Sequence, residues 1–273
     1  MRLRRLCLSK CTLKPICYIH TVEDHLTKTG DIVEIEEFDI VPGRTLAGRY
    51  VVIEKLGSGY EGEVYRVREK HTNIERAVKI YFPQRNKKFK VSTRYSLKLE
   101  KLKHSPIVMD CLSHELITLK GQKVACLTSE FIEGEMLGEF IQKQKNKRLE
   151  IFSAIHLLYS IVVGVESIHL EGEYHGDLHT ENIIIRRFGL EFDLKIIDLH
   201  HWGDSKKDNR DEDIIKIIRI FYDILGGQKH YKKLSPSIKY IICGLKRGMI
   251  LNRFKNISML RYHLETMDWS DAV

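Results

Sequence analysis

Two aspartates and an asparagine in the middle of the chain are spaced in a way that suits phosphate chemistry. Asp177 and Asn182 are five residues apart in the segment 175–182, which reads His-Gly-Asp-Leu-His-Thr-Glu-Asn. A carboxylate can accept the proton of an attacking hydroxyl, and an amide oxygen can bind a metal ion. Asp198 ends an apolar run, where a carboxylate is costly unless a cation such as phosphate-bound Mg²⁺ meets it. The plain alternatives are a polar loop and an aspartate that caps a turn.

A glycine-rich turn and a lysine precede these residues. Gly57, Gly59 and Gly62 lie between two predicted strands, and glycines allow backbone N–H groups to approach phosphate oxygens. Because strands flank the turn on both sides, a dinucleotide-binding fold is disfavoured. Lys79 stands in the apolar run 77–80 and could neutralise nucleotide phosphates. Taken alone, the glycine-rich segment could be a turn without a ligand, and Lys79 could be a solvated lysine. The order of the two motifs along the chain favours a nucleotide site.

The elements that must position these residues fall into two halves. In the first half, short runs rich in Val, Ile and Tyr predict an antiparallel sheet. These runs are Tyr50–Leu56, Glu63–Arg68, Arg76–Phe82, Leu112–Leu119 and Val124–Phe131. Leucines at helical spacing predict one helix that ends before Pro106.

The second half is predicted to be mostly helical. The apolar stretch Ile151–Leu170 predicts a buried helix, and a later helix should begin at Asp211 or Asp213 and stop at Gly226-Gly227. Two short apolar runs, 182–186 and 194–197, predict a hairpin between these helices. The expected organisation is α+β, with an extension over residues 1–46 and lobes over 47–133 and 134–273.

Composition narrows the function only a little. The chain has 273 residues, 43% of them hydrophobic, and a net charge of +8, which tolerates anionic partners. Its basic runs, 87–90, 143–148 and 206–207, lack interleaved aromatics and predict solvated faces rather than a specific nucleic-acid groove. Six scattered cysteines without a Cys-x-x-Cys pair favour reduced thiols and a cytoplasmic protein. We expect no membrane span.

Taken in order, these motifs resemble those of the protein kinase superfamily, from about Tyr50 to Leu225. The resemblance implies a two-lobed fold with a five-stranded antiparallel N-lobe, one helix and a shortened, mostly helical C-lobe. It also implies ATP as the phosphate donor, Mg²⁺ as the metal and a protein as the acceptor.

The same resemblance assigns a role to each candidate residue. Lys79 would hold the α- and β-phosphates, Asp177 would act as base, and Asn182 and Asp198 would bind Mg²⁺. His179 takes the place of the lysine that steadies the transferred phosphate, with a structural hydrogen bond as the alternative. The implied ATP-binding residues are Gly57, Gly59, Gly62, Val64, Ala77, Lys79 and, in the hinge, Glu130 and Ile132. Asp213 matches the aspartate that braces the catalytic loop.

Several positions depart from the family pattern. Tyr95 stands where the glutamate that pairs with the lysine is expected, so Glu100 or an acid of the extension is the predicted substitute. His200 replaces a glycine after the metal aspartate, and Gly176 replaces an arginine that would bind an activation-loop phosphate.

The substrate platform is also short, because only about fifteen residues separate Asp198 from Asp213. The catalytic loop is similar to that of aminoglycoside and choline phosphotransferases as well. Three functions therefore stay open: a protein serine/threonine kinase, a small-alcohol kinase and a nucleotide-binding pseudokinase scaffold.

Overall fold

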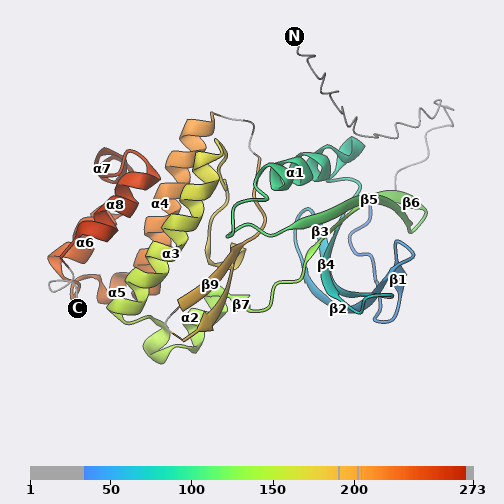
Figure 1. The fold of residues 1–273 in the computed structure, drawn as a ribbon, viewed down its shortest axis with the longest axis horizontal. Helices are drawn as coiled ribbons and strands as arrows, with labels where there is room; N and C mark the ends of the chain where they lie inside the picture. Colours follow the sequence, from blue (N-terminus) through green and yellow to red (C-terminus); the bar gives the residue numbers. More distant parts are fainter. Residues whose placement is uncertain (1–33, 190, 202, 204, 269–273) are drawn as a thin grey trace, which may run out of the picture. The chain divides into compact units, whose positions relative to one another are not determined.

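The first half of the chain folds into an antiparallel sheet with one helix beside it (Figure 1). The computed structural model describes residues 34–189, 191–201, 203 and 205–268. The strands are β1 (Thr45–Leu46), β2 (Tyr50–Ser58), β3 (Gly62–Glu69), β4 (Glu75–Tyr81), β5 (Cys111–Leu119) and β6 (Gln122–Glu130), in the order β1-β2-β3-β4-β6-β5. The five predicted strands are confirmed. β1 was not predicted, because two residues are too few to show an alternating pattern.

The two faces of this sheet have different roles. Tyr65 and Val67 of β3 and Val78 and Ile80 of β4 are fully buried in one core. The alternate residues point to the other face, where Val64 pairs in register with Lys79. The period of two thus directs the lysine away from that core and into the candidate site.

Residues 34–41 lie on the buried face of the sheet. Phe38 stacks on Phe82 with ring centroids 5.3 Å apart, and Ile35 and Ile40 are buried beside it. The backbone N–H of Phe38 donates to the buried carboxylate of Glu63. The extent of the extension, residues 1–46, stays a prediction, and residues 1–33 lie outside the described part of the chain.

Helix α1 (Lys90–Lys101) packs beside the sheet through Tyr95 and Leu99, which are buried in the second core. It follows the short 3₁₀ helix η1 (Lys87–Phe89) and ends five residues before Pro106, as the leucine spacing predicts. Its position puts Tyr95 next to Lys79, whose Nζ lies 5.6 Å from the tyrosine ring centroid.

The second half is mostly helical and contains a small sheet. The helices are α2 (Leu137–Lys143), α3 (Ile151–Leu170), α4 (Lys206–Ile224), α5 (Gln228–Tyr231), α6 (Pro236–Ile242), α7 (Arg247–Arg253) and α8 (Ile257–Thr266), with 3₁₀ turns η2 (Lys145–Lys147), η3 (Thr180–Asn182) and η4 (Cys243–Leu245). Strands β7 (Glu135–Met136), β8 (Ile183–Phe188) and β9 (Glu191–Ile196) form an antiparallel sheet. The predicted hairpin is confirmed as β8 and β9.

Helix α3 is the predicted buried helix, and α4 lies alongside it (Figure 1). By length and composition α3 could cross a membrane, but eleven of its twenty residues are buried within the protein, as expected for a core helix.

The predicted start of α4, at Asp211 or Asp213, is wrong. The helix begins at Lys206, where the side chain of Ser205 caps it by accepting the N–H of Asp208. Its first three residues, 206–208, are polar and exposed, so the apolar period could not reveal the start of the helix.

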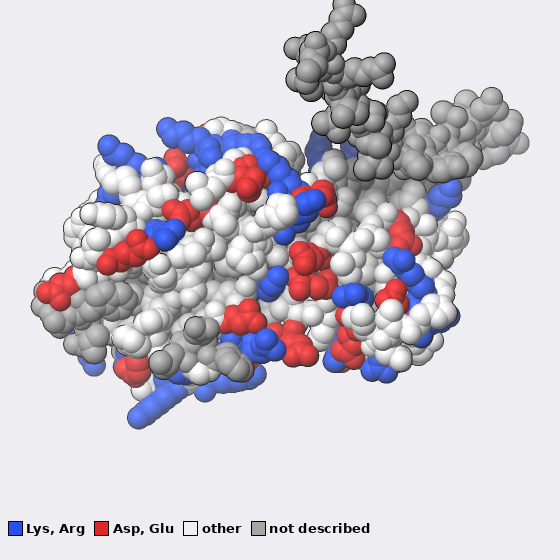
Figure 2. All heavy atoms as spheres, in the orientation of Figure 1, with Lys and Arg blue, Asp and Glu red and all other residues white. Residues whose placement is uncertain are grey.

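The charged side chains are spread over the surface. On the face drawn in Figure 2, acidic and basic groups are interspersed. Lys87, Lys88, Lys143, Lys145 and Lys206 from the basic runs are all exposed, as predicted for solvated faces.

Candidate active site

A buried aspartate of α4 holds the loop that carries Asp177. Asp213 is only 1% exposed, and its Oδ2 accepts the N–H of His175 at 2.7 Å and lies 3.0 Å from His169 Nε2. Its Oδ1 accepts the N–H of Gly176 at 2.9 Å. Three hydrogen bonds to one ionised acceptor fix the loop backbone just before Asp177. The predicted bracing role of Asp213 is confirmed.

His175 links this loop to the strand that ends at Asp198. Its Nδ1 accepts the N–H of Asp177 at 3.1 Å, so Nε2 carries the proton and donates to the carbonyl of Ile197 at 2.9 Å. Burial lowers the pKa of His175, which keeps the ring neutral. The carbonyl of His175 accepts the N–H of His200 at 2.8 Å. The two predicted acids, Asp177 and Asp198, are therefore placed by one buried imidazole.

Asn182 and His179 lie next to Asp177. The Asn182 Nδ2 donates to the carbonyl of Asp177 at 2.8 Å, which leaves Oδ1 as the atom that can bind a metal ion. His179 Nε2 lies 3.7 Å from Asp177 Oδ2 and 2.9 Å from Asn182 Nδ2. The side chains of Asp177 and Asp198 are 48% and 44% exposed, so both can be reached by a substrate or an ion.

Lys79 makes two ion pairs. Its Nζ lies 2.8 Å from Asp198 Oδ1 and 3.0 Å from Glu61 Oε2. Burial by itself would lower the pKa of Lys79, but the two carboxylates outweigh it and raise the pKa above its ordinary value. Glu100, the predicted partner, is wrong: it is exposed and pairs with Lys103. Glu100 stands on the outer face of α1, so the helix cannot bring it to the lysine.

The backbone around Asp198 is held by α1 as well. Tyr95 Oη accepts the N–H of Asp198 at 3.2 Å, and Lys98 Nζ donates to the carbonyl of His200 at 2.6 Å. Asp198 has a positive φ of 56°, a conformation that aspartate adopts more readily than most residues but that still needs support. Tyr95 and Lys98 supply that support, which the sequence pattern did not indicate.

The glycine-rich turn leaves open space where a phosphate would lie. A Cβ added at Gly57 or Gly59 would meet no atom within 4 Å, so the protein itself does not require glycine there. At Gly62, in contrast, a Cβ would lie 2.0 Å from the carbonyl oxygen of Ile80. Gly62 thus serves close packing of β3 on β4, and the two other glycines suit a bound ligand.

The remaining predicted ATP-binding residues line the same side of the sheet or the hinge. Ala77 stands two residues before Lys79 and therefore shares its face with Val64. The side chain of Glu130 accepts from Lys195 Nζ at 2.8 Å and is thereby tied to β9. Among the described residues, no hydrogen bond uses the backbone of Ile132, so its N–H and carbonyl can face a nucleotide base.

The donor set fits a hard divalent cation next to phosphates. Asp198 offers carboxylate oxygen and Asn182 offers amide oxygen, the ligand types that Mg²⁺ takes in nucleotide sites. Lys79 and the open turn at Gly57 and Gly59 suit the phosphate chain. The structure thus brings the predicted catalytic and metal-binding residues to one place, and it adds Glu61, an acid inside the glycine-rich turn to which the sequence motifs assign no role.

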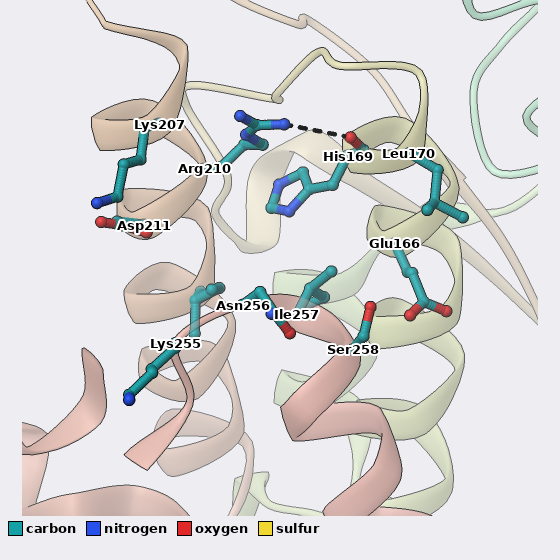
Figure 3. A pocket seen from close by; sticks show the side chains of 11 residues that line it. Glu166, His169, Leu170, Lys207, Arg210, Asp211, Lys255, Asn256, Ile257 and Ser258 are labelled. Carbon is teal, nitrogen blue, oxygen red and sulfur yellow. Dashed lines mark hydrogen bonds between the residues drawn. The ribbon is translucent and has the colours of Figure 1, made fainter. Parts of the chain in front are cut away.

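A separate pocket of about 330 Å³ lies in the helical lobe between α3, α4 and α8 (Figure 3). Arg210 donates to the carbonyl of His169 at 3.4 Å at one end, and Asn256, the N-cap of α8, and Ser258 of α8 lie at the other. None of the predicted site residues is among the described residues that line it. The pocket borders the frame that supports the loop, through His169, and is distinct from the candidate site.

Comparisons with known proteins agree with this geometry. A family model described as the protein kinase domain matches residues 50–223. The sporulation protein kinase mde3 of Schizosaccharomyces pombe is 28% identical over 145 residues, which make up 51% of this chain and 25% of that protein. A serine/threonine-protein kinase of Arabidopsis thaliana is 28% identical over 173 residues, or 60% of this chain and 29% of that protein. The chain spans less than a third of the length of either relative.

Solved structures show the same fold. The crystal structure of a double mutant of the Mycobacterium tuberculosis PknI kinase domain superimposes with a TM-score of 0.61 at 15% identity. The match covers 84% of this chain and 97% of that domain. At this identity the likeness concerns the fold, and the chemistry must be argued from the residues of the site.

Proposed function

This chain belongs to the protein kinase superfamily, and on that premise we propose that it transfers the γ-phosphoryl group of ATP, with Mg²⁺, to a hydroxyl group of protein serine or threonine. One observation carries the proposal. An amine (Lys79), a carboxylate at a strand end (Asp198), an amide oxygen (Asn182) and an exposed carboxylate (Asp177) converge between the sheet and the helices. This is the set of groups that phosphoryl transfer needs.

In the proposed reaction, Asp177 accepts the proton of the acceptor hydroxyl as its oxygen attacks the γ-phosphorus. The bond from phosphorus to the bridging oxygen of ADP breaks, and ADP leaves with that electron pair. Lys79 holds the α- and β-phosphates, and the open turn at Gly57 and Gly59 accommodates the phosphate chain. His179, 3.7 Å from Asp177, faces the transferred group. The metal ion held by Asn182 and Asp198 would neutralise charge on the phosphates.

A protein acceptor is favoured by the relatives described above, which are named as protein kinases. One observation favours a small alcohol instead. Helix α4 begins at Lys206, so only residues 199–205 lie between Asp198 and the helix, where a longer segment would support a peptide. The small-alcohol kinase is therefore the second candidate.

A direct phosphotransfer assay tests the proposal. The full chain is incubated with Mg²⁺ and γ-labelled ATP, alone, with generic protein substrates, and with a panel of small alcohols that includes choline and aminoglycosides. We expect labelled protein, and we expect Asp177→Ala to lower the rate about 10²- to 10⁴-fold. Asp193→Asn is the matched control, because Asp193 is an exposed acid of β9 paired with Arg186. Labelled alcohol without labelled protein would reject the protein acceptor.

A pseudokinase scaffold is the remaining reading, suggested by Tyr95 and His200. The ion pairs of Lys79 and the exposure of Asp177 argue against it. Thermal stabilisation by Mg²⁺ and nucleotide without turnover in any assay would support the scaffold. A cytoplasmic location stays a prediction from the cysteine pattern.

A further inference from the structure

Lys79 has two acidic partners, Asp198 and Glu61, with different proposed roles. Asp198, at 2.8 Å, is also the proposed metal ligand, so its charge is shared with Mg²⁺ when nucleotide is bound. Glu61, at 3.0 Å, is not among the proposed metal ligands. The carboxylate that can remain on the lysine throughout the reaction is therefore that of Glu61.

Helix α1 cannot supply this carboxylate. Its single acidic residue, Glu100, is 65% exposed and pairs with Lys103. The residues that α1 buries are Ser92, Tyr95, Lys98 and Leu99, and none of them carries a negative charge at neutral pH. The tyrosine and the lysine bind the backbone of residues 198–200 instead.

The glycine-rich turn is built to hold Glu61 against β4. The carbonyl of Glu61 accepts the N–H of Phe82 at 2.8 Å, directly after β4. Next to it, Tyr60 lies under the guanidinium of Arg85 at 4.1 Å and shares a hydrogen bond of 2.7 Å with it. Gly62 allows the backbone to approach Ile80. Two anchors in the segment directly after β4 and one close contact on β4 itself thus hold the turn beside the strand that bears Lys79.

We infer that Glu61 positions Lys79 for the phosphates in place of a carboxylate on α1, so that the glycine-rich turn, and not the helix, sets the position of the lysine. The inference rests on the proposed function and names a positioning residue for that site. It predicts that Lys79 keeps its carboxylate partner whatever the position of α1. The contacts of Tyr60 with Arg85 and of Glu61 with Phe82 hold the turn in place.

The test moves the carboxylate from the turn to the helix. Glu61→Gln should lower kcat about 10- to 100-fold while the KM for ATP changes about threefold or less, because a misplaced lysine affects the transition state more than binding. Either change at Tyr95 also removes its hydrogen bond to the Asp198 N–H, so rescue is measured between matched double variants. Glu61→Gln with Tyr95→Glu should be at least about tenfold more active than Glu61→Gln with Tyr95→Gln, because the Tyr95 ring centroid already lies 5.6 Å from Lys79 Nζ. Tyr95→Gln in the same background is the uncharged control, and Glu100→Gln should have no effect.

Two results would overturn the inference. One is a Glu61→Gln protein with wild-type kcat; the other is equal activity of the two double variants, since rescue must depend on charge. A wild-type chain that binds Mg²⁺ and nucleotide but transfers no phosphate would defeat the proposed function only. Crystals of wild type with Mg²⁺ and AMP-PNP then decide: Lys79 within about 4 Å of Glu61 supports the inference, and a different carboxylate on the lysine overturns it.

Discussion

Replacing Asp213 by asparagine should uncouple the catalytic loop from α4 without changing its size. The single amide oxygen can serve the two donors at Oδ2, His175 N–H and His169 Nε2, which lie 2.7 and 3.0 Å away. The amide NH₂ then faces the N–H of Gly176, which loses a bond of 2.9 Å to a charged acceptor. Losing a hydrogen bond to a charged group costs about 1.5–3 kcal/mol.

We therefore expect a loss of about 1.5–3 kcal/mol in the free energy of unfolding. For a chain of this size, that corresponds to a fall in Tm of roughly 3 to 12 °C. Urea unfolding and thermal melting measure both quantities. Phosphotransfer is measured well below the variant's Tm, where kcat should still be reduced because the backbone before Asp177 has lost its anchor.

Asp211→Asn is the control, because Asp211 is a partly exposed acid two residues earlier in the same helix. It should change stability by about 0.5 kcal/mol or less. An Asp213→Asn protein within about 1 kcal/mol of wild type would refute the reasoning, since three hydrogen bonds to a buried charge would then be worth no more than one exposed contact.

Three further predictions follow from other parts of the structure. Gly62→Ala should destabilise the protein by about 1–3 kcal/mol or more, because the added Cβ would lie 2.0 Å from the carbonyl oxygen of Ile80. Gly59→Ala should leave the Tm unchanged, because its Cβ meets open space, and should weaken nucleotide binding in a titration. Burial lowers the pKa of Lys98 to about 8, although the charges of Glu173 and Asp213 oppose this shift. Between pH 8 and 10.5 the unfolded chain therefore binds more protons than the folded chain, and the free energy of unfolding rises with pH. Lys98→Met should remove this rise, about 3 kcal/mol in urea unfolding. Phe38→Ala should cost about 3–5 kcal/mol in the same assay, because its ring is buried against Phe82.

Each of these has an outcome that would count against it. Equal Tm values for the alanine variants at Gly59 and Gly62 would mean that the turn does not pack on β4. A Lys98→Met protein whose stability still rises by the wild-type amount between pH 8 and 10.5 would assign that rise to other groups. Val41→Ala is the control for Phe38, since Val41 is 64% exposed and should behave as a neutral surface change.

Most of the fold could be predicted because its patterns are local. Alternation of apolar residues located β2 to β6, and an apolar stretch located α3. The start of α4 at Lys206 was not predicted, because a capping serine and polar first residues show no apolar periodicity. The two-residue strand β1 was not predicted, because it is defined only by its pairing with β2.

The parts of the candidate site that depend on residue type and spacing could be predicted. The parts that depend on which side chains meet in space could be predicted less well. Asp177, Asn182 and Asp198 were placed from their types and spacing, and the structure brings them together. The partner of Lys79 was not found, because counting along the chain assumes that the acid stands on the helix. An acid inside the turn, one residue before Gly62, was the available signal, since Gly62 pairs with Tyr81 and so carries its neighbour to β4.

The two ion pairs of Lys79 report on different events because they differ in sequence separation. Glu61 is 18 residues from Lys79 and directly precedes β3, whose first residue, Gly62, pairs with Tyr81 at the end of β4, so this pair needs only local structure. Asp198 is 119 residues away and reaches the lysine only when the sheet and the helical half are together. A local pair needs little loop closure, while a distant one depends on packing of the whole domain. A variant that loosens the two halves should therefore separate Lys79 from Asp198 first, and Glu61 should stay on the lysine.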